Sequence, residues 1–267
     1  MLLVIPFCQV DHKLALALAK YLQYLGPYKQ HELMLACPEH ISDKVEEIET
    51  AIGDQFARTH IFFPKGYREG WPTGCNTMFS GIAYHIANSI DCKCWYMYEP
   101  DNTPIKPGWL NSLEVEYARG GRPFFGVIHP THWRRKDGSW YQDGVHLVGT
   151  SIYPKEAPRY SNLFPTIQHS GYPFDVYWQW DIVKHATSTN LIQHDWRTVD
   201  FARDKKSGEI VGHRDSKEMP LDYKGPVTLR PDAVTHHGCK DGSLMQIMRG
   251  MFISRTQGIE NTVLAES

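Results

Sequence analysis

The chain has 267 residues, 42% of them hydrophobic, which is enough to bury a sizeable core and excludes a disordered protein. Its 28 Lys and Arg residues balance 30 Asp and Glu residues; this excludes a global nucleic-acid-binding charge, although a local basic patch stays open. No run approaches the ~20 apolar residues that span a bilayer. The six cysteines have neither CxxC nor zinc-finger spacing, so we expect free thiols in a cytoplasmic protein.

The first half of the chain alternates between apolar runs and amphipathic segments. The apolar runs predict strands at 2–7, 31–37, 59–63, 92–98 and 124–129. The amphipathic segments predict helices at 12–25, 42–52, 76–90 and 107–119. This alternation favours a parallel α/β sheet, whose functional residues lie at the carboxyl ends of its strands. Beyond residue 130 aromatic residues and cations dominate and only 176–186 keeps a helical pattern, yet no linker or repeat divides the chain.

Two carboxylates follow the strand predicted at 92–98. Glu99 and Asp101 are separated by Pro100, and in extended backbone the side chains of residues i and i+2 point the same way. A convergent carboxylate pair suits a hard divalent cation, which can bind a diphosphate and neutralise its charge as it leaves. The alternative is a solvated acidic turn beside proline.

This acidic segment carries a resemblance to a known family. Glu99-Pro100-Asp101, followed by two prolines and Trp109-Leu110, resembles the motif that GT-A glycosyltransferases carry after their fourth strand. The order of elements over 1–130 agrees. The resemblance implies an α/β, GT-A (Rossmann-like) fold with a central, mostly parallel sheet flanked by helices. It also implies a single domain (1–267), with a nucleotide-sugar-binding half at 1–130 and an aromatic-rich acceptor-binding half at 131–267.

The family's cofactors follow from the same resemblance. They are Mn²⁺ or Mg²⁺ and a nucleotide sugar, with a UDP-sugar favoured. The first acidic position is Glu99 where the family usually has Asp. Asp101 is therefore the stronger metal ligand, and Glu99 binds the metal, the ribose or a water.

Residues at two other strand ends are implied to hold the nucleotide. The loop after the first strand supplies Phe7, Cys8 and Asp11, and the start of the helix at 76–90 supplies Gly74 and Asn76. A glycine allows close backbone approach, and a helix N-terminus favours phosphate. The alternative is that Asp11 is an ordinary N-cap and that Gly74 and Asn76 belong to an ordinary helix start.

The catalytic base is expected in the aromatic segment 173–181. Inverting members of the family place a carboxylate at a helix start here, and Asp181 matches that position best, with Asp175 in reserve. The chemistry needs a carboxylate that takes the proton of the attacking acceptor hydroxyl. Either residue is otherwise a helix cap. Inversion or retention at the anomeric carbon stays open.

A polar loop near the C-terminus is expected to complete the site. Several GT-A families add a C-terminal His to the metal and a nearby Lys to the diphosphate. His236 or His237 and Lys240 correspond to these residues. A histidine pair on the surface is the alternative.

The acceptor is assigned from the segment 132–141. It has the pattern of a hairpin with Asp137-Gly138 at its turn, and its cations are flanked by aromatic residues. Further cations follow at Arg203, Lys205, Lys206, Arg214 and Lys217. Cations mixed with stacking rings suit a flipped base, so a hydroxymethylated base in DNA, modified by a viral enzyme in the host cytoplasm, is the leading hypothesis for the acceptor. The alternative is a solvated hairpin, or a surface on which a sugar stacks against tryptophan.

Other functions remain open beside this one. The acceptor is otherwise a bacterial surface glycan, a lipid or a protein. A nucleotidyltransferase would share the core, but it usually carries a Gly-rich basic loop after the first strand, which residues 7–11 lack. A non-catalytic carbohydrate- or nucleic-acid-binding protein would use the 8 Trp and 14 Tyr residues as stacking platforms. The oligomeric state is not predicted.

Overall fold

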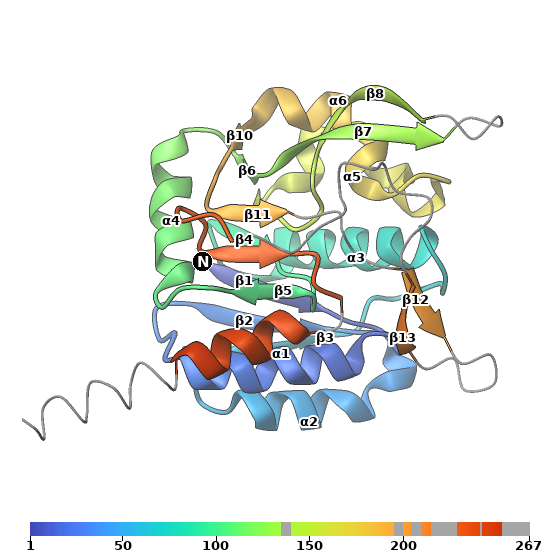
Figure 1. The fold of residues 1–267 in the computed structure, drawn as a ribbon. Helices are drawn as coiled ribbons and strands as arrows, with labels where there is room; N and C mark the ends of the chain where they lie inside the picture. Colours follow the sequence, from blue (N-terminus) through green and yellow to red (C-terminus); the bar gives the residue numbers. More distant parts are fainter. Residues whose placement is uncertain (135–139, 195–199, 204–209, 215–228, 241, 253–267) are drawn as a thin grey trace, which may run out of the picture.

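The computed structural model describes residues 1–134, 140–194, 200–203, 210–214, 229–240 and 242–252 (Figure 1). A seven-stranded sheet forms its centre, in the order β10-β6-β9-β4-β1-β2-β3. All pairs in it are parallel except those of β9, which runs antiparallel to β4 and β6. The strands are β1 (Leu2–Pro6), β2 (Glu32–Ala36), β3 (Thr59–Phe62), β4 (Cys94–Met97), β6 (Phe124–Gly126), β9 (Ile152–Pro154) and β10 (Ala186–Ser188).

Helices cover both faces of this sheet. One face packs against α1 (His12–Leu25), α2 (Asp43–Ile52) and α4 (Trp109–Gly120), and the other against α3 (Thr73–Ser89), α5 (Phe174–Tyr177) and α6 (Gln179–Ile182). The alternation of β1 explains the two cores, because Leu3 and Ile5 enter one and Leu2 and Val4 the other. Figure 1 shows α1 and α2 on one side of the sheet and the β7–β8 ribbon at the opposite end of the molecule. The predicted fold class is confirmed.

Two predicted elements are divided in the structure. The strand expected at 124–129 ends at Gly126, and β7 (Ile128–Arg134) pairs instead with β8 (Trp140–Leu147) in a separate antiparallel ribbon. This pairing confirms the hairpin, whose turn lies outside the described residues. The helix expected at 176–186 breaks at Trp178, where φ is −106°. Trp178 is buried, with its ring centroid 5.2 Å from that of Phe79, so tertiary packing overrides the helical period.

A three-stranded sheet brings together strands from three distant parts of the chain. Its order is β11 (Ile192–His194), β14 (Thr235–His237), β5 (Asn102–Pro104). The prediction of a loop around His236 and His237 is therefore wrong, because these residues pair with β5 and β11. The pairing places His237 opposite Asn102, directly beside the acidic turn.

The last described helix, residues 243–252, lies along α1. A Cβ on Gly242 would come 3.0 Å from Leu14, and the guanidinium of Arg249 lies 5.8 Å from the ring centroid of Tyr24. None of the described helices combines the length and apolar character that a bilayer crossing requires.

Candidate active site

The acidic segment after β4 is a tight turn and not extended backbone. The amide of Asn102 donates to the carbonyl of Glu99 over 2.9 Å. The amide side chain of Asn102 donates to Thr150 Oγ1 over 2.7 Å, and Thr150 Oγ1 donates to the carbonyl of Met97 over 3.0 Å. The two carboxylates therefore converge because this hydrogen-bonded turn folds them together, and not through the strand alternation that the sequence suggested.

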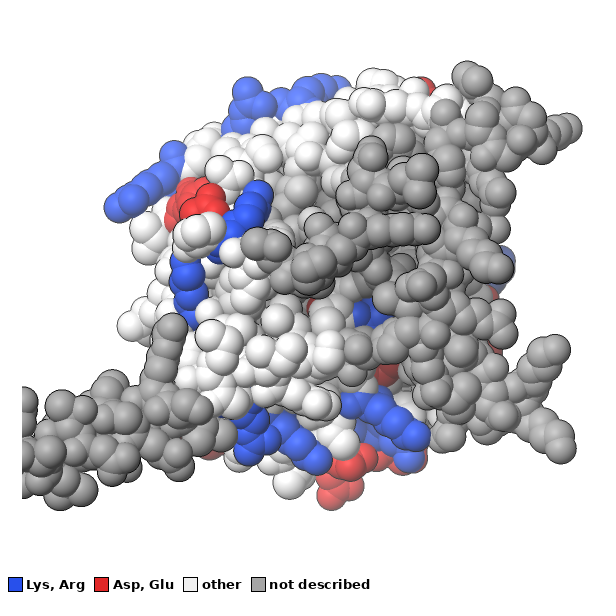
Figure 2. Space-filling model, in the orientation of Figure 1, with Lys and Arg blue, Asp and Glu red and all other residues white. Residues whose placement is uncertain are grey.

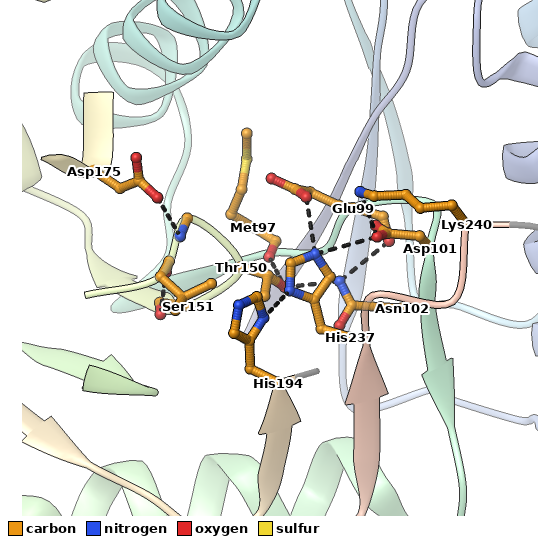
Figure 3. A network of polar contacts seen from close by, with 12 residues as sticks. Met97, Glu99, Asp101, Asn102, Thr150, Ser151, Asp175, His194, His237 and Lys240 are labelled. Carbon is orange, nitrogen blue, oxygen red and sulfur yellow. Dashed lines mark hydrogen bonds and ion pairs between the residues drawn. The ribbon is translucent and has the colours of Figure 1, made fainter. Parts of the chain in front are cut away.

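Three side chains meet at this turn. Glu99, Asp101 and His237 each offer an atom, and these atoms lie within 4.8 Å of one another. His237 Nε2 lies 3.0 Å from Glu99 Oε2 and 3.3 Å from Asp101 Oδ2 (Figure 3). Two carboxylates and an imidazole suit Mn²⁺ or Mg²⁺, which prefer oxygen ligands. The donor set fits such an ion, with Asp101 and Glu99 supplying the oxygens.

Positive charge already surrounds Asp101. Lys240 Nζ lies 2.5 Å from Asp101 Oδ2. Burial would raise the pKa of Asp101, but the charges of His237 and Lys240 outweigh it and hold this pKa well below its usual range. In return, although burial lowers the pKa of His237, the charge of Asp101 and hydrogen bonds to both carboxylates raise it to about 9. The cluster is thus built to hold cationic groups against buried carboxylates.

His194 contacts the imidazole ring of His237. Its Nδ1 lies 2.7 Å from Nδ1 of His237, and the two rings stack with centroids 4.8 Å apart. Burial and the charge of His237 lower the pKa of His194. His194 therefore serves as a neutral hydrogen-bond partner that fixes the ring of His237.

His236 lies away from the three-residue cluster. It alternates with His237 along β14, so its side chain leaves the opposite face of that small sheet. Among the described residues the cluster of potential ligands contains His237 and not His236. Of the two histidines between which the sequence could not choose, His237 is the one at the site.

Asp175, at the start of α5, lies on the other side of Glu99 from Lys240. Its Oδ2 accepts a hydrogen bond from the amide of Gly149 over 3.1 Å and its Oδ1 one from its neighbour Val176 over 3.0 Å. Burial and then the charge of Glu99 raise the pKa of Asp175 to about 7. Figure 3 shows Glu99 between Asp175 and Lys240. A carboxylate with this pKa beside a metal site suits a general base at neutral pH.

Asp181 has other partners. Ser161 Oγ donates to Asp181 Oδ2 over 2.5 Å, and Lys184 Nζ lies 3.7 Å from Asp181 Oδ1. Both contacts tie α6 to neighbouring segments, and neither involves Glu99, Asp101 or His237. The geometry therefore favours Asp175 over Asp181 as the base.

The loop after β1 borders the same site. Asp11 Oδ1 accepts from the amide of Cys8 over 2.6 Å, so Asp11 closes the loop and makes no side-chain cap on α1. The pKa of Asp11 is raised to about 6, because burial outweighs the opposing effect of the nearby Lys240 charge. Cys8 is half-buried, whereas Phe7 belongs to the core. The Phe7 ring therefore packs inside the protein, whereas the Asp11 carboxylate lies near Lys240 and Asp101.

The start of α3 is held by the segments around it. A Cβ on Gly74 would lie 3.0 Å from Tyr67 Oη and 3.1 Å from the carbonyl of Arg68, so glycine allows the preceding loop to pack there. Asn76 is buried, and its Nδ2 donates to the carbonyls of Ser170 (3.3 Å) and Tyr172 (2.8 Å). Its Oδ1 has no hydrogen-bond partner among the described residues. Asn76 thus ties α3 to the segment around Ser170 and Tyr172.

Four residues of the site carried no signal in the sequence. Thr150, His194, Thr131 and His146 belong to no motif. His194, Thr131 and His146 are placed by strand pairings and Thr150 by the bend between β8 and β9, and residue patterns reveal neither. The structure does not test the DNA hypothesis, because the cations on which it depends, at 134–136 and 203–217, have side chains outside the part of the chain that the structure describes. Figure 2 shows the described Lys and Arg side chains of one face in several separate groups, most of them near its edges, with Asp and Glu beside some of them.

Comparison with models of protein families gives no match, and neither does comparison with curated protein sequences. Solved structures do match. Two structures of LgtC superpose with a TM-score of 0.51, cover 90% of this chain and 87% of theirs, and are 12% and 11% identical. One is an active-site mutant, and the other is the galactosyltransferase in complex with donor and acceptor sugar analogs.

Two further structures are similar over less of the chain. Mouse xyloside xylosyltransferase 1 has a TM-score of 0.44 at 10% identity and covers 74% of this chain and 87% of its own. The 4-diphosphocytidyl-2C-methyl-D-erythritol synthase of Anaerococcus prevotii has a TM-score of 0.45 at 8% identity and covers 71% and 86%. The likeness to LgtC shows that this chain has the GT-A fold.

Proposed function

We propose that the protein is a metal-dependent glycosyltransferase that moves a sugar from a nucleoside-diphosphate sugar, most simply a UDP-sugar, to a hydroxyl acceptor. One observation carries this proposal. Glu99, Asp101 and His237 converge within 4.8 Å at the carboxyl end of β4, with Lys240 beside them. In open α/β sheets ligands bind at this edge. The galactosyltransferase LgtC, whose fold this chain shares, was solved with donor and acceptor sugar analogs.

The donor side of the site divides into two roles. Glu99, Asp101 and His237 hold Mn²⁺ or Mg²⁺, which supplies positive charge to the diphosphate as it leaves. Lys240 adds an ammonium group that can leave Asp101 and pair with a phosphate oxygen. The loop that Asp11 closes, and the start of α3 at Gly74, border the space for the nucleotide.

Asp175 acts on the acceptor in this proposal. It takes the proton of the acceptor hydroxyl while that oxygen bonds to the anomeric carbon, and the bond from this carbon to the diphosphate breaks with its electron pair on phosphate. The carboxylate is suited to this because its pKa, near 7, lies close to neutral pH. Asp181 has no part in the step.

The test is hydrolysis of a panel of nucleotide sugars. The purified protein with Mn²⁺ should release nucleoside diphosphate from one of them, and chelation should abolish the release. Asp101→Asn serves as the matched inactive control. Absence of metal-dependent turnover and of metal-dependent nucleotide binding across the panel would overturn the proposal and favour a non-catalytic binding protein.

The acceptor needs its own experiment. A hydroxymethylated base in DNA depends on the cations around the β7–β8 turn, and a glycan acceptor depends on exposed rings such as Trp180. Transfer to hydroxymethylated DNA should fall steeply with salt, because phosphate contacts release counterions. Arg134→Ala combined with Arg135→Ala and Lys136→Ala should remove this transfer and leave donor hydrolysis intact. Transfer to oligosaccharides alone would replace DNA with a glycan.

A further inference from the structure

A line of buried polar side chains ends at Asp175. Thr131 Oγ1 on β7 donates to Gln179 Oε1 on α6 over 2.6 Å. The same Thr131 oxygen lies 2.9 Å from Nδ1 of His146 on β8. The other ring nitrogen, His146 Nε2, faces Asp175 Oδ2 over 3.9 Å. All members of this line are buried except Asp175, which keeps 17% of its side chain exposed.

The hydrogen bonds of this line select one tautomer of His146. A hydroxyl group has a single hydrogen, and that of Thr131 is given to Gln179. The Thr131 oxygen can therefore only accept from His146, so the proton of the neutral ring sits on Nδ1. Nε2 then carries a lone pair, and it is this lone pair that faces Asp175.

We propose that Thr131 and Gln179 hold His146 as its Nδ1–H tautomer, so that the ring presents a lone pair and not an N–H donor to Asp175. This inference rests on the proposed role of Asp175 as the base. His146 is a positioning residue in it, since it acts on the acceptor only through Asp175. An N–H donor at this place would stabilise the carboxylate and make it a weaker base, whereas a lone pair leaves its proton affinity high.

Among the other groups around Asp175, the charge of Glu99 also raises its pKa, whereas the backbone amides of Gly149 and Val176 lower it. Glu99 after β4 faces it with negative charge, and Cys75 on α3 and Tyr153 on β9 lie near it, with their own pKa values raised first by burial. Around His146 itself, the His129 ring of β7 lies 6.1 Å away between centroids, and His194 of β11 is also nearby. No cation in this described set opposes the high proton affinity of Asp175.

The tautomer can be observed directly in the wild-type protein. Long-range ¹H–¹⁵N NMR of ¹⁵N-histidine-labelled protein, without metal or nucleotide, distinguishes a protonated Nδ1 from a protonated Nε2. We expect His146, assigned by its loss in His146→Gln, to show Nδ1–H above the pH at which the ring becomes neutral. An Nε2–H ring, the commoner tautomer of free histidine, would overturn the inference.

A matched pair of substitutions tests the consequence. Thr131→Val keeps the shape of the side chain and removes the oxygen, so His146 is free to place its proton on Nε2 and donate to Asp175. The acidic limb of the pH profile for nucleotide-sugar hydrolysis should then move down by about one unit, the worth of one hydrogen bond to a carboxylate. Thr131→Ser keeps the oxygen and should keep the wild-type limb. Equal limbs in both variants would contradict the inference.

The two kinds of failure are separable. If no nucleotide sugar is hydrolysed, the proposed function fails while the NMR experiment still reports the tautomer. If hydrolysis occurs but His146 is an Nε2–H ring, the proposed function stands and the tautomer inference fails. A Thr131→Val protein that does not fold leaves the wild-type NMR result to decide.

Discussion

Asp101 is a buried acid and Asp175 a half-buried one at the same edge of the sheet, yet their pKa values move in opposite directions. Asp101, which is 2% exposed, has Lys240 Nζ at 2.5 Å and His237 Nε2 at 3.3 Å, and its pKa lies well below the usual range. Asp175 accepts hydrogen bonds from two backbone amides and faces the charge of Glu99, and its pKa rises to about 7. Burial raises both, so the neighbouring charges decide the outcome.

The difference assigns two kinds of chemistry to the two regions. A carboxylate that stays ionised at every physiological pH suits a metal ligand. A carboxylate that exchanges its proton near pH 7 suits a general base. Each of the following experiments changes one side of this comparison.

The largest effect is expected from Asp101→Asn. The amide keeps the size of the side chain but removes the negative charge that holds Lys240, His237 and the metal. Turnover should fall on the order of 10³-fold, the cost of losing a central electrostatic contact. Mn²⁺ binding by calorimetry should disappear, while circular dichroism reports a folded protein. Tight Mn²⁺ binding by a folded Asp101→Asn variant would remove Asp101 from the metal site.

Asp175→Asn should lower turnover on the order of 10²-fold, the usual worth of a general base. Nucleotide binding and Mn²⁺ binding should be unchanged, because Asp175 is not one of the three side chains of the Glu99, Asp101 and His237 cluster. Asp181→Asn is the matched control and should stay close to wild type, since Asp181 is engaged with Ser161 and Lys184. A larger loss in Asp181→Asn than in Asp175→Asn would reverse this assignment.

Stability should also distinguish the two acids through its pH dependence. The pKa of Asp175 is raised from 3.8 to about 7, so between these values the folded protein holds a proton that the unfolded chain has released. Stability from this group is therefore lost as pH rises through about 7. The pKa of His237 is raised from 6.5 to about 9, so the stability that this residue contributes is lost as pH rises through about 9.

Denaturant unfolding in chelator between pH 5 and 9.5 measures this dependence. Asp175→Asn should flatten the decline between pH 5 and 7 and leave the decline near pH 9. Asp101 acts in the opposite sense, because its lowered pKa gives stability that is lost only in strong acid. An Asp175→Asn protein with the wild-type slope below pH 7 would show that Asp175 keeps an ordinary pKa.

The smallest effect is expected from Lys240→Ala. Without nucleotide, the Lys240 ammonium competes with a metal ion for Asp101, so its removal should tighten Mn²⁺ binding a few-fold. With nucleotide, the lost phosphate partner should raise the KM for the sugar donor. Lys20→Ala is the control, because Lys20 lies on α1 and not at the acidic turn. Weaker Mn²⁺ binding in Lys240→Ala would mean that Lys240 supports the metal site and does not compete for it.

Much of the fold could be predicted from local pattern. The apolar runs at 2–7 and 31–37 and the amphipathic segment at 42–52 correspond to β1, β2 and α2 within one or two residues. Such periods depend only on which faces an element must bury. The pattern failed at 176–186, where the buried Trp178 breaks the helix.

By itself, the sequence determined the α/β class and the place of the acidic turn, because strand and helix periods and proline-marked strand ends are local properties. Only the tertiary structure selected His237 over His236 and favoured Asp175 over Asp181. The choice of His237 depends on the register of β14 against β5. The choice of Asp175 depends on its position beside Gly149, whereas Asp181 lies beside Ser161. Those neighbours come from distant parts of the chain, so no pattern within a short segment could reveal them.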